Sequence, residues 1–319
     1  MIKKMTVPVF FSADEKYAPY LAVAIASLID HTNPAYKYEL HVVYHDMKKR
    51  TVRRIASLGD GHENIEVLMT EMKDTLSGIS DRKETRLKGD YFTPTIYYRI
   101  FLPEMFKDCE KGIYLDSDIV VLGDVAELYK VDLGGNLIGA CSDISANNNE
   151  LFCDYFEQVV GVDSKKYINS GVLLMDFKKM REEEFVERFL YLLNTYDFDT
   201  VAPDQDYLNS MCYGRILHLD QIWNAMPTPT KKFVRNPMIV HYNMFFKPWH
   251  YDGTMYEEFF WKYANESSFL KDIQHEKRNF TRWDKKGDEK RLQWMADRVT
   301  EILGNEVTFR TVMRGLDKK

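Results

Sequence analysis

Two aspartates separated by one residue, Asp116 and Asp118, follow the apolar run GIYL in the segment GIYLDSDIVVL (112–122). Neighbouring carboxylates repel each other unless a cation neutralises them. Hard oxygen ligands of this kind suit Mg²⁺ or Mn²⁺, and such an ion commonly bridges to a phosphate group. The alternative is a turn after a strand, in which aspartate side chains bond to the backbone. The spacing alone leaves both interpretations open.

Two further stretches place polar groups next to apolar runs. FFSADEKY (10–17) closes the first strand and leads into a helix, the position that often holds a nucleotide base or ribose in doubly wound folds. INSGVLL (168–174) places Asn169 and Ser170 just before a buried run, and Gly171 allows close approach of another backbone or a ligand. Both stretches therefore add candidate ligand-binding groups to the aspartate pair.

The second half of the chain supplies candidates of other chemical types. In PDQDYLN (203–209), helical geometry prevents Asp204 and Asp206 from facing the same site, so only one is a candidate, and helix capping is the alternative role. His241 and Lys247 occur together in VHYNMFFKPWH (240–250), where an imidazole and an ammonium could complete a metal-diphosphate site. A purely structural role is the alternative for the histidine.

An α/β domain with a largely parallel sheet is expected to position these groups, because strand and helix patterns alternate over the first 120 residues. The expected strands are 6–11, 38–44, 64–69, 112–116 and 168–177. A helix is expected to begin near Pro19 and end before Asn33-Pro34, and a second, amphipathic helix is expected over 182–196. Open α/β sheets bind ligands beyond the carboxyl ends of their strands, which is where the aspartate pair falls.

Composition excludes several classes of protein. The 319 residues are 45% apolar and can bury one large core or two modest ones, and the formal net charge of −6 argues against a nucleic-acid binder. Four cysteines without CxxC spacing indicate reduced thiols rather than a disulfide framework or a zinc site. The N-terminal apolar stretch is too short for a signal peptide or a membrane span, so we predict a cytoplasmic location.

The last part of the chain differs in charge from the rest. Residues 266–319 contain 13 Lys and Arg against 10 Asp and Glu, a local net charge of +3. We expect a peripheral, helical segment there, in which Lys285, Lys286, Lys290, Arg291 and Trp294 either lie on the anionic inner face of the cell membrane or form a solvated helix face. The predicted division is a catalytic domain over 1–265, with halves at about 1–122 and 123–265, and a helical C-terminal extension over 266–319.

Seven segments together resemble one enzyme family. They are FFSADEKYAPYL, YYRIFLPEMF, YLDSDIVV, INSGVLLMDFKKMR, PDQDYLN, WNAMPT and HYNMFFKPWH, in the order and approximate spacing seen in glycosyltransferase family 8. The resemblance covers about residues 6–250, and the family includes bacterial lipopolysaccharide α-galactosyltransferases and α-glucosyltransferases and, more distantly, glycogenin. It implies a GT-A fold, with a Rossmann-like nucleotide-binding half and a mixed, mainly parallel central sheet.

The resemblance also implies an activity and its ligands. The activity is a retaining transfer of galactose or glucose from a UDP-sugar to a glycan or lipopolysaccharide-type acceptor, which could be lipid-linked. It implies a Mn²⁺ cofactor, with Mg²⁺ as the alternative, bound by Asp116, Asp118 and His241. Lys247 would contact the diphosphate. The other positions that resemble donor-binding positions of the family are Ala13, Asp14, Lys16, Arg99 and Ser117.

Four residues fall where the family surrounds the donor sugar and the reaction centre: Asp143, Asn169, Asp204 and Gln205. A two-step retaining route needs an enzyme nucleophile, and an amide such as that of Gln205 is a poor one, so we favour attack from the same face as departure. The sequence departs from the family pattern at Met244, where glycine is usual, and at Lys16, where asparagine is usual.

Two other functions remain open at this point. DSDIVV also fits the opening motif of haloacid-dehalogenase-type phosphatases, although about 110 residues precede it here and those motifs normally begin a domain. A protein that binds a nucleotide-sugar and metal without turnover is the second alternative. The oligomeric state is also open, a homo-oligomer included.

Overall fold

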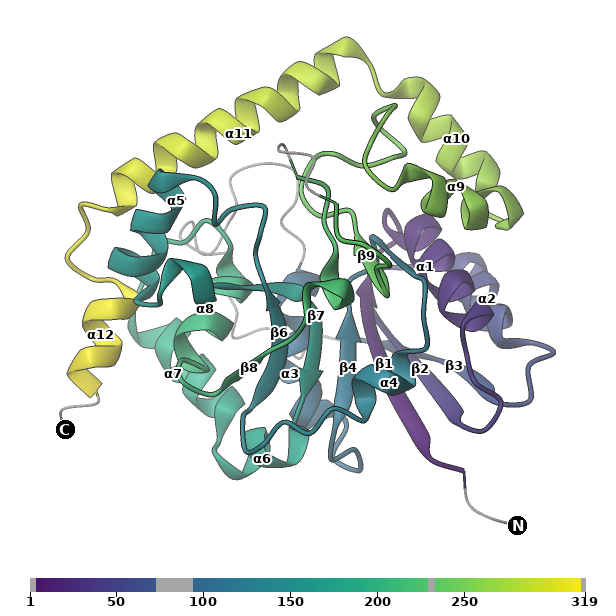
Figure 1. Cartoon of the computed structure of the whole chain (residues 1–319), viewed down its shortest axis with the longest axis horizontal. Helices are drawn as coiled ribbons and strands as arrows, with labels where there is room; N and C mark the ends of the chain where they lie inside the picture. The colour runs from purple at the N-terminus through teal and green to yellow at the C-terminus, as the bar shows by residue number, and fades with distance from the viewer. Residues whose placement is uncertain (1–3, 73–93, 229–232, 317–319) are drawn as a thin grey trace.

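The computed structural model describes residues 4–72, 94–228 and 233–316, and its centre is a seven-stranded sheet (Figure 1). The strand order is β3-β2-β1-β4-β7-β6-β8. The strands are β1 Thr6–Ala13, β2 Lys37–Tyr44, β3 Ile65–Glu71, β4 Gly112–Leu115, β6 Ile138–Ser142, β7 Ile168–Met175 and β8 Ile216–His218. All neighbouring pairs are parallel except β4–β7 and β7–β6, which are antiparallel. The expected mixed, mainly parallel sheet is confirmed.

A small antiparallel ribbon lies beside the main sheet. It pairs β5 Ile119–Val121 with β9 Ile239–His241, so that Ile119 is opposite His241. This pairing places the residues that follow the aspartate pair next to residues 239–241, about 120 positions later in the chain.

Helices cover both faces of the main sheet. The first eight are α1 Ala18–Asp30, α2 Lys49–Ala56, α3 Tyr98–Met105, α4 Val125–Tyr129, α5 Glu150–Tyr155, α6 Phe177–Glu182, α7 Phe185–Thr195 and α8 Pro203–Met211. One core joins α1 to the strands and the ribbon, and a second core joins α3, α6, α7 and α8 to the opposite face. Every residue of β7 is buried, as expected for a strand covered on both sides.

The five predicted strands and the first predicted helix are confirmed. Pro19 lies in the first turn of α1, where its missing N–H costs no hydrogen bond. The helix predicted over 182–196 is wrong at its start: α6 ends at Glu182, and Glu184 adopts a left-handed conformation (φ +50°) before α7 begins at Phe185. The three consecutive glutamates at 182–184 have the pattern of an acidic first turn of a helix. In the structure they form the bend between α6 and α7 instead.

Four helices follow the ribbon: α9 Glu257–Glu266, α10 Leu270–Asn279, α11 Arg282–Ile302 and α12 Phe309–Leu316. α10 packs against α1, α11 against α5, and α12 against α8. α11 therefore crosses the top of Figure 1, above the carboxyl ends of the parallel strands. The helical tail is confirmed, but it is not peripheral. In the part of the chain that the structure describes, no helix is both long and apolar enough to span a bilayer.

Candidate active site

The aspartate pair occupies the short connection between β4 and β5. Its backbone is held from both sides, because the Asp116 N–H donates to the Gly171 carbonyl (2.8 Å) and the Tyr242 N–H donates to the Asp118 carbonyl (2.9 Å). The strand itself ends at Leu115, so strand alternation does not orient the two carboxylates. The two carboxylates are oriented instead by the backbone contacts with β7 and with Tyr242, the residue after β9.

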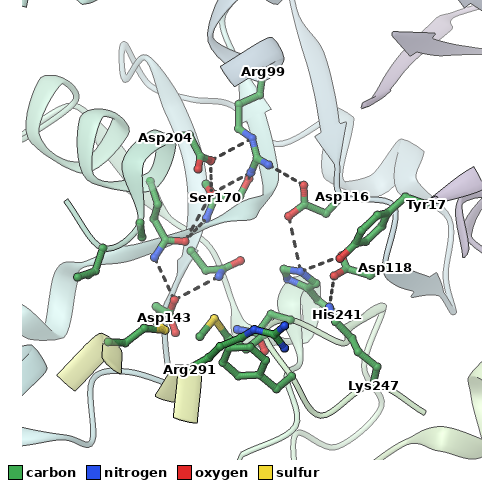
Figure 2. A pocket seen from close by; sticks show the side chains of 18 of the residues that line it. Tyr17, Arg99, Asp116, Asp118, Asp143, Ser170, Asp204, His241, Lys247 and Arg291 are labelled. Carbon is green, nitrogen blue, oxygen red and sulfur yellow. Dashed lines mark hydrogen bonds and ion pairs between the residues drawn. The ribbon is translucent and has the colours of Figure 1, made fainter. Parts of the chain in front are cut away.

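His241, the last residue of β9, faces both carboxylates (Figure 2). Its Nε2 lies 3.3 Å from Asp118 Oδ1 and 3.6 Å from Asp116 Oδ2, and the side chain is 2% exposed. Ligand atoms of the three residues all lie within 4.8 Å of one another. The structure therefore brings together the three groups for which one shared metal ion was predicted.

A chain of amide hydrogen bonds sets the tautomer of His241. The Gly171 N–H donates to Asn169 Oδ1 (3.0 Å), so the Asn169 amide group donates to Asp143 Oδ2 (3.2 Å). Asn224 Nδ2 donates to the same Asn169 Oδ1 (2.9 Å), which leaves Asn224 Oδ1 as the acceptor 3.1 Å from His241 Nδ1. The neutral imidazole thus carries its proton on Nδ1 and turns the Nε2 lone pair toward two carboxylates. One nitrogen and two oxygen donors in this arrangement fit a divalent ion such as Mn²⁺.

Asp116 keeps one oxygen for the protein and one for this site. Its Oδ1 accepts from Arg99 Nη2 (2.8 Å) and from the Tyr114 hydroxyl (2.8 Å), whereas Oδ2 is the atom nearest His241. Arg99 is 5% exposed and also donates from Nη1 to the Ser170 carbonyl (2.6 Å), and its Nε lies 3.2 Å from Asp204 Oδ2. Burial alone lowers the pKa of Arg99, but the two carboxylates outweigh it and hold the pKa above its ordinary value. Arg99 is therefore a permanent buried cation.

Asp118 divides its oxygens in the same way. Oδ2 accepts from the Lys247 ammonium, which also donates to the Tyr242 carbonyl, and Oδ1 faces His241. Burial on its own raises the pKa of Asp118, but the Lys247 ammonium beside it is the largest opposing influence, and the pKa lies below its ordinary value. The carboxylate is therefore ionised, as a metal ligand must be.

Asp143, Gln205 and Asp204 form a second polar cluster, carried by β6, β7 and α8. Asp143 Oδ2 accepts from Gln205 Nε2 (3.1 Å), and Gln205 Oε1 accepts from the Ser170 N–H (3.0 Å). Asp204 Oδ2 accepts from the Ser170 hydroxyl (3.0 Å). Burial raises the pKa of Asp204, which the positive charge of Arg99 partly opposes. All four residues predicted around the reaction centre, Asn169 included, are therefore in one hydrogen-bonded network.

Asp204 and Asp206 point in different directions, as helical geometry predicted. Asp206 is fully buried and accepts from the hydroxyls of Tyr155 (2.7 Å) and Tyr167 (2.6 Å). Burial raises the pKa of Asp206 to about 7 despite these donors. Asp206 therefore ties α8 to α5 and β7 and does not reach the site.

The metal-ligand group and the polar cluster share one cavity of about 260 Å³. Its lining includes Asp116, Asp118, Asp143, Asn169, Ser170, Asp204, Gln205, His241, Asn243, Met244, Lys247 and Arg99. Met244, the departure from the family's glycine, has φ +55° and is 43% exposed at the cavity wall. A neighbouring cavity of about 310 Å³ shares several of these residues and is lined mainly by apolar side chains.

Four predicted donor-binding residues are not among the described residues that line this cavity: Ala13, Asp14, Lys16 and Ser117. Two of them, Asp14 and Ser117, contact segments that border the cavity. Asp14 Oδ1 accepts from the Tyr17 N–H (2.9 Å), and Tyr17 does line the cavity. The Ser117 hydroxyl donates to the Ser12 carbonyl (2.8 Å) and so ties the aspartate loop to the end of β1.

Several residues of the site, some of which line the cavity, were missed from the sequence. Tyr17 lies directly after the predicted nucleotide-binding residues, and Asn224 lies in the WNAMPT segment, where it received no role. Arg291, Trp294 and Met295 come from α11 and line the cavity, although the sequence placed the first two in a peripheral tail. Nothing in the local pattern of α11 could have revealed this, because its helical charge pattern is that of a solvated face.

The chain resembles known proteins over most of its length. The family model described as "Glycosyl transferase family 8" matches residues 8–253. A Haemophilus influenzae protein is 28% identical over 225 residues, which cover 70% of this chain and 64% of that protein, so this chain spans less than two thirds of that relative. A lipopolysaccharide 1,2-glucosyltransferase of Escherichia coli K12 is 24% identical over 282 residues, 83% of this chain and 79% of that protein.

Among solved structures, the galactosyltransferase LgtC in complex with donor and acceptor sugar analogues superposes with a TM-score of 0.69 at 26% identity. The match covers 82% of this chain and 96% of LgtC, and it confirms the expected GT-A fold. Since the family model matches well over half of the chain, and the matched residues include the metal-ligand group and the polar cluster, the chain belongs to glycosyltransferase family 8.

Proposed function

We propose that this protein transfers a hexose, galactose or glucose, from a UDP-sugar to a glycan or lipopolysaccharide-type acceptor with retention of anomeric configuration. The observation that carries the proposal is the convergence of Asp116, Asp118 and His241 on one point of a cavity that also contains Lys247 and the Asp143 cluster. The similarity to a lipopolysaccharide glucosyltransferase and to a galactosyltransferase supports the donor and acceptor class.

Mn²⁺, or Mg²⁺, would be held by the two aspartates and His241. When bound there, a divalent ion supplies Lewis-acid stabilisation for a departing nucleoside diphosphate. Lys247 keeps its ammonium beside Asp118, and an ammonium has three N–H donors, of which two reach Asp118 and Tyr242. The third can bind a diphosphate oxygen, so that Lys247 stabilises the charge that develops as the sugar departs.

The polar cluster argues for attack from the same face as departure. A double displacement needs a free carboxylate next to the sugar, but Asp204 is held by Arg99 and the Ser170 hydroxyl. Asp143 accepts hydrogen bonds on both oxygens, from Ser145 on one and from Gln205 on the other. Carboxylates engaged in this way are weak nucleophiles. They are well placed to orient sugar hydroxyls and to stabilise a cationic ring.

The test is incubation with a panel of UDP-sugars, Mn²⁺ and saccharide acceptors, with UDP release measured and the anomeric configuration of the product determined by NMR. We expect acceptor-dependent UDP release and a product with the configuration of the donor. Asp118→Asn should lower turnover at least about 100-fold, in the range of losses for an electrostatic catalytic group. Asp60→Asn, which changes an exposed aspartate in the turn before β3, is the matched control and should behave as wild type.

Three results would contradict the proposal. Full activity of Asp118→Asn would remove the metal site from the mechanism. Phosphate release from simple phosphomonoesters without any nucleotide requirement would favour the phosphatase alternative. Tight binding of a UDP-sugar with no transfer or hydrolysis under any acceptor would favour the non-catalytic alternative.

A cytoplasmic location and contact with the inner face of the cell membrane remain predictions. On α11, Lys285, Lys286 and Trp283 are exposed and could meet an anionic surface. Arg291 and Trp294 line the cavity, so we no longer include them in the predicted membrane-contacting surface.

A further inference from the structure

Helix α11 forms one wall of the cavity and lies outside residues 8–253, the part that matches the family model. Arg291, Trp294 and Met295 line the cavity with the metal-ligand group, and Leu292 and Ala296 line the apolar cavity beside it. Figure 1 shows α11 passing above the carboxyl ends of the strands. The family match therefore assigns no role to these side chains.

The helix is anchored firmly enough to hold a side chain in place. At its C-terminal end, Val299 and Ile302 are buried against Tyr155 and Phe156 of the α5 region. At its N-terminal end, the Thr281 and Asp284 side chains and backbone form a capping box. The C-terminal end of α11 is thus packed against the domain, and the Tyr251–Asp288 hydrogen bond connects its first half to the segment after β9.

Arg291 is oriented by a buried carboxylate. Its Nη1 donates to Asp288 Oδ1 (2.8 Å), one turn earlier on α11, and Asp288 is 3% exposed. Asp288 Oδ2 accepts from the Tyr251 hydroxyl (2.8 Å), and Tyr251 follows the segment that carries Lys247. Asp288 therefore holds the Arg291 guanidinium in place through one oxygen and connects α11 to the segment that carries Lys247 through the other.

The charges in the cavity distinguish Arg291 from the other cations. Arg99 is paired with Asp116 and Asp204, and Lys247 with Asp118, all of which are themselves cavity residues. Among the described residues, Arg291 is paired with Asp288, which does not line the cavity. Of this pair, the guanidinium therefore lines the cavity and the carboxylate does not.

We propose that Arg291 binds the diphosphate of the donor, together with Lys247, so that α11 completes the donor site; this inference rests on the proposed function. A guanidinium has five N–H donors in a planar fork that matches phosphate oxygens. Arg291 lines the cavity that contains the metal-ligand group, Tyr17 and Lys247, and it does not line the neighbouring apolar cavity. The guanidinium therefore belongs to the cavity in which the metal-ligand group and Lys247 would hold the donor diphosphate (Figure 2).

The test compares ligands with and without phosphates on the full chain. Affinities for UDP and for uridine are measured with Mn²⁺ present, by calorimetry and ligand-observed NMR, for wild type, Arg291→Gln and Arg291→Lys. We expect Arg291→Gln to bind UDP about 10- to 100-fold more weakly, as expected for loss of a charged hydrogen-bonding group, with uridine affinity unchanged within about twofold. Arg291→Lys keeps the charge without the fork and should recover part of the UDP affinity.

Lys290→Gln is the matched control, because Lys290 is the preceding residue on α11, has the same charge and is exposed. It should bind UDP as wild type does. The thermal unfolding midpoint of each variant separates a binding effect from loss of the fold, and Arg291→Lys serves as the test variant if Arg291→Gln does not fold.

Three outcomes would overturn the inference. They are UDP affinity within about twofold of wild type in Arg291→Gln, an equal loss for UDP and uridine, or a rise in the KM for the acceptor alone. The last would assign Arg291 to an anionic group on the acceptor. Wild-type protein that fails to bind UDP at all would instead refute the proposed function.

Discussion

Replacing Asn224 with alanine removes the acceptor that holds the His241 proton on Nδ1. Asn224 is fully buried and its Oδ1 lies 3.1 Å from His241 Nδ1. Without it, the imidazole can carry its proton on Nε2, the atom that faces Asp116 and Asp118, and a protonated Nε2 cannot bind a metal ion. We expect Asn224→Ala to weaken Mn²⁺ binding while the three ligand residues stay unchanged.

The magnitude follows from what remains around the ring. Loss of a residue that orients a metal-bound histidine typically costs about 10- to 100-fold in metal affinity, or about 1.4 to 2.8 kcal/mol. His241 is also packed against Gly171, where an added Cβ would lie 2.2 Å from His241 Cε1. This contact limits tilting of the ring, so the main loss is the choice of tautomer. We therefore expect an effect near the lower end, about 10-fold.

The assay is electron paramagnetic resonance of free Mn²⁺, titrated with protein in the absence of nucleotide, which needs no turnover. Asn224→Asp is the control, because a carboxylate keeps the acceptor for Nδ1–H and should retain or strengthen Mn²⁺ binding. Circular dichroism establishes that both variants are folded. The reasoning is refuted if Asn224→Ala binds Mn²⁺ within about twofold of wild type, or if Asn224→Asp is as weak as Asn224→Ala.

Three further predictions follow from the same contacts. Gly171→Ala places a methyl group 2.2 Å from His241 Cε1 and should weaken Mn²⁺ binding at least about 10-fold. Gly287→Ala, where the added methyl group has no neighbour closer than 3.8 Å, is the control and should bind Mn²⁺ as wild type does. Equal Mn²⁺ binding by both variants would count against the site geometry. Because burial raises the pKa of Asp206 to about 7, the folded protein keeps a proton that the unfolded chain releases near pH 4. The free energy of unfolding should therefore fall from about pH 4 to 7, by at most about 1.4 kcal/mol per pH unit, and Asp206→Asn should flatten that slope in urea titrations; identical slopes would contradict the assignment. Arg99→Met leaves the buried carboxylate of Asp204 and the half-buried carboxylate of Asp116 without their cation. It should lower the free energy of unfolding by about 3 to 5 kcal/mol, and a loss below about 1 kcal/mol would contradict this.

The elements of the sheet could be predicted because their signals are local. The apolar run VLLM (172–175) in the second half of β7 is typical of a strand buried on both faces, and it needs no knowledge of distant residues. The separation of Asp204 from Asp206 was also predictable, since it depends only on helical geometry. The bend at Glu184 was not, because three glutamates fit a helix start as well as a turn.

The sequence by itself determined the type of chemistry, because the residue types, their order and their places at strand ends resemble one family of glycosyltransferases. It did not determine which side chains meet. The backbone of Asp116 and Asp118 is held by β7 and by Tyr242, the residue after β9, and His241 reaches both carboxylates because β9 pairs with β5. Asn224 and Arg291 entered the site only through packing between segments far apart in the chain. Such contacts depend on how whole elements fit together, and no local pattern of residues encodes them.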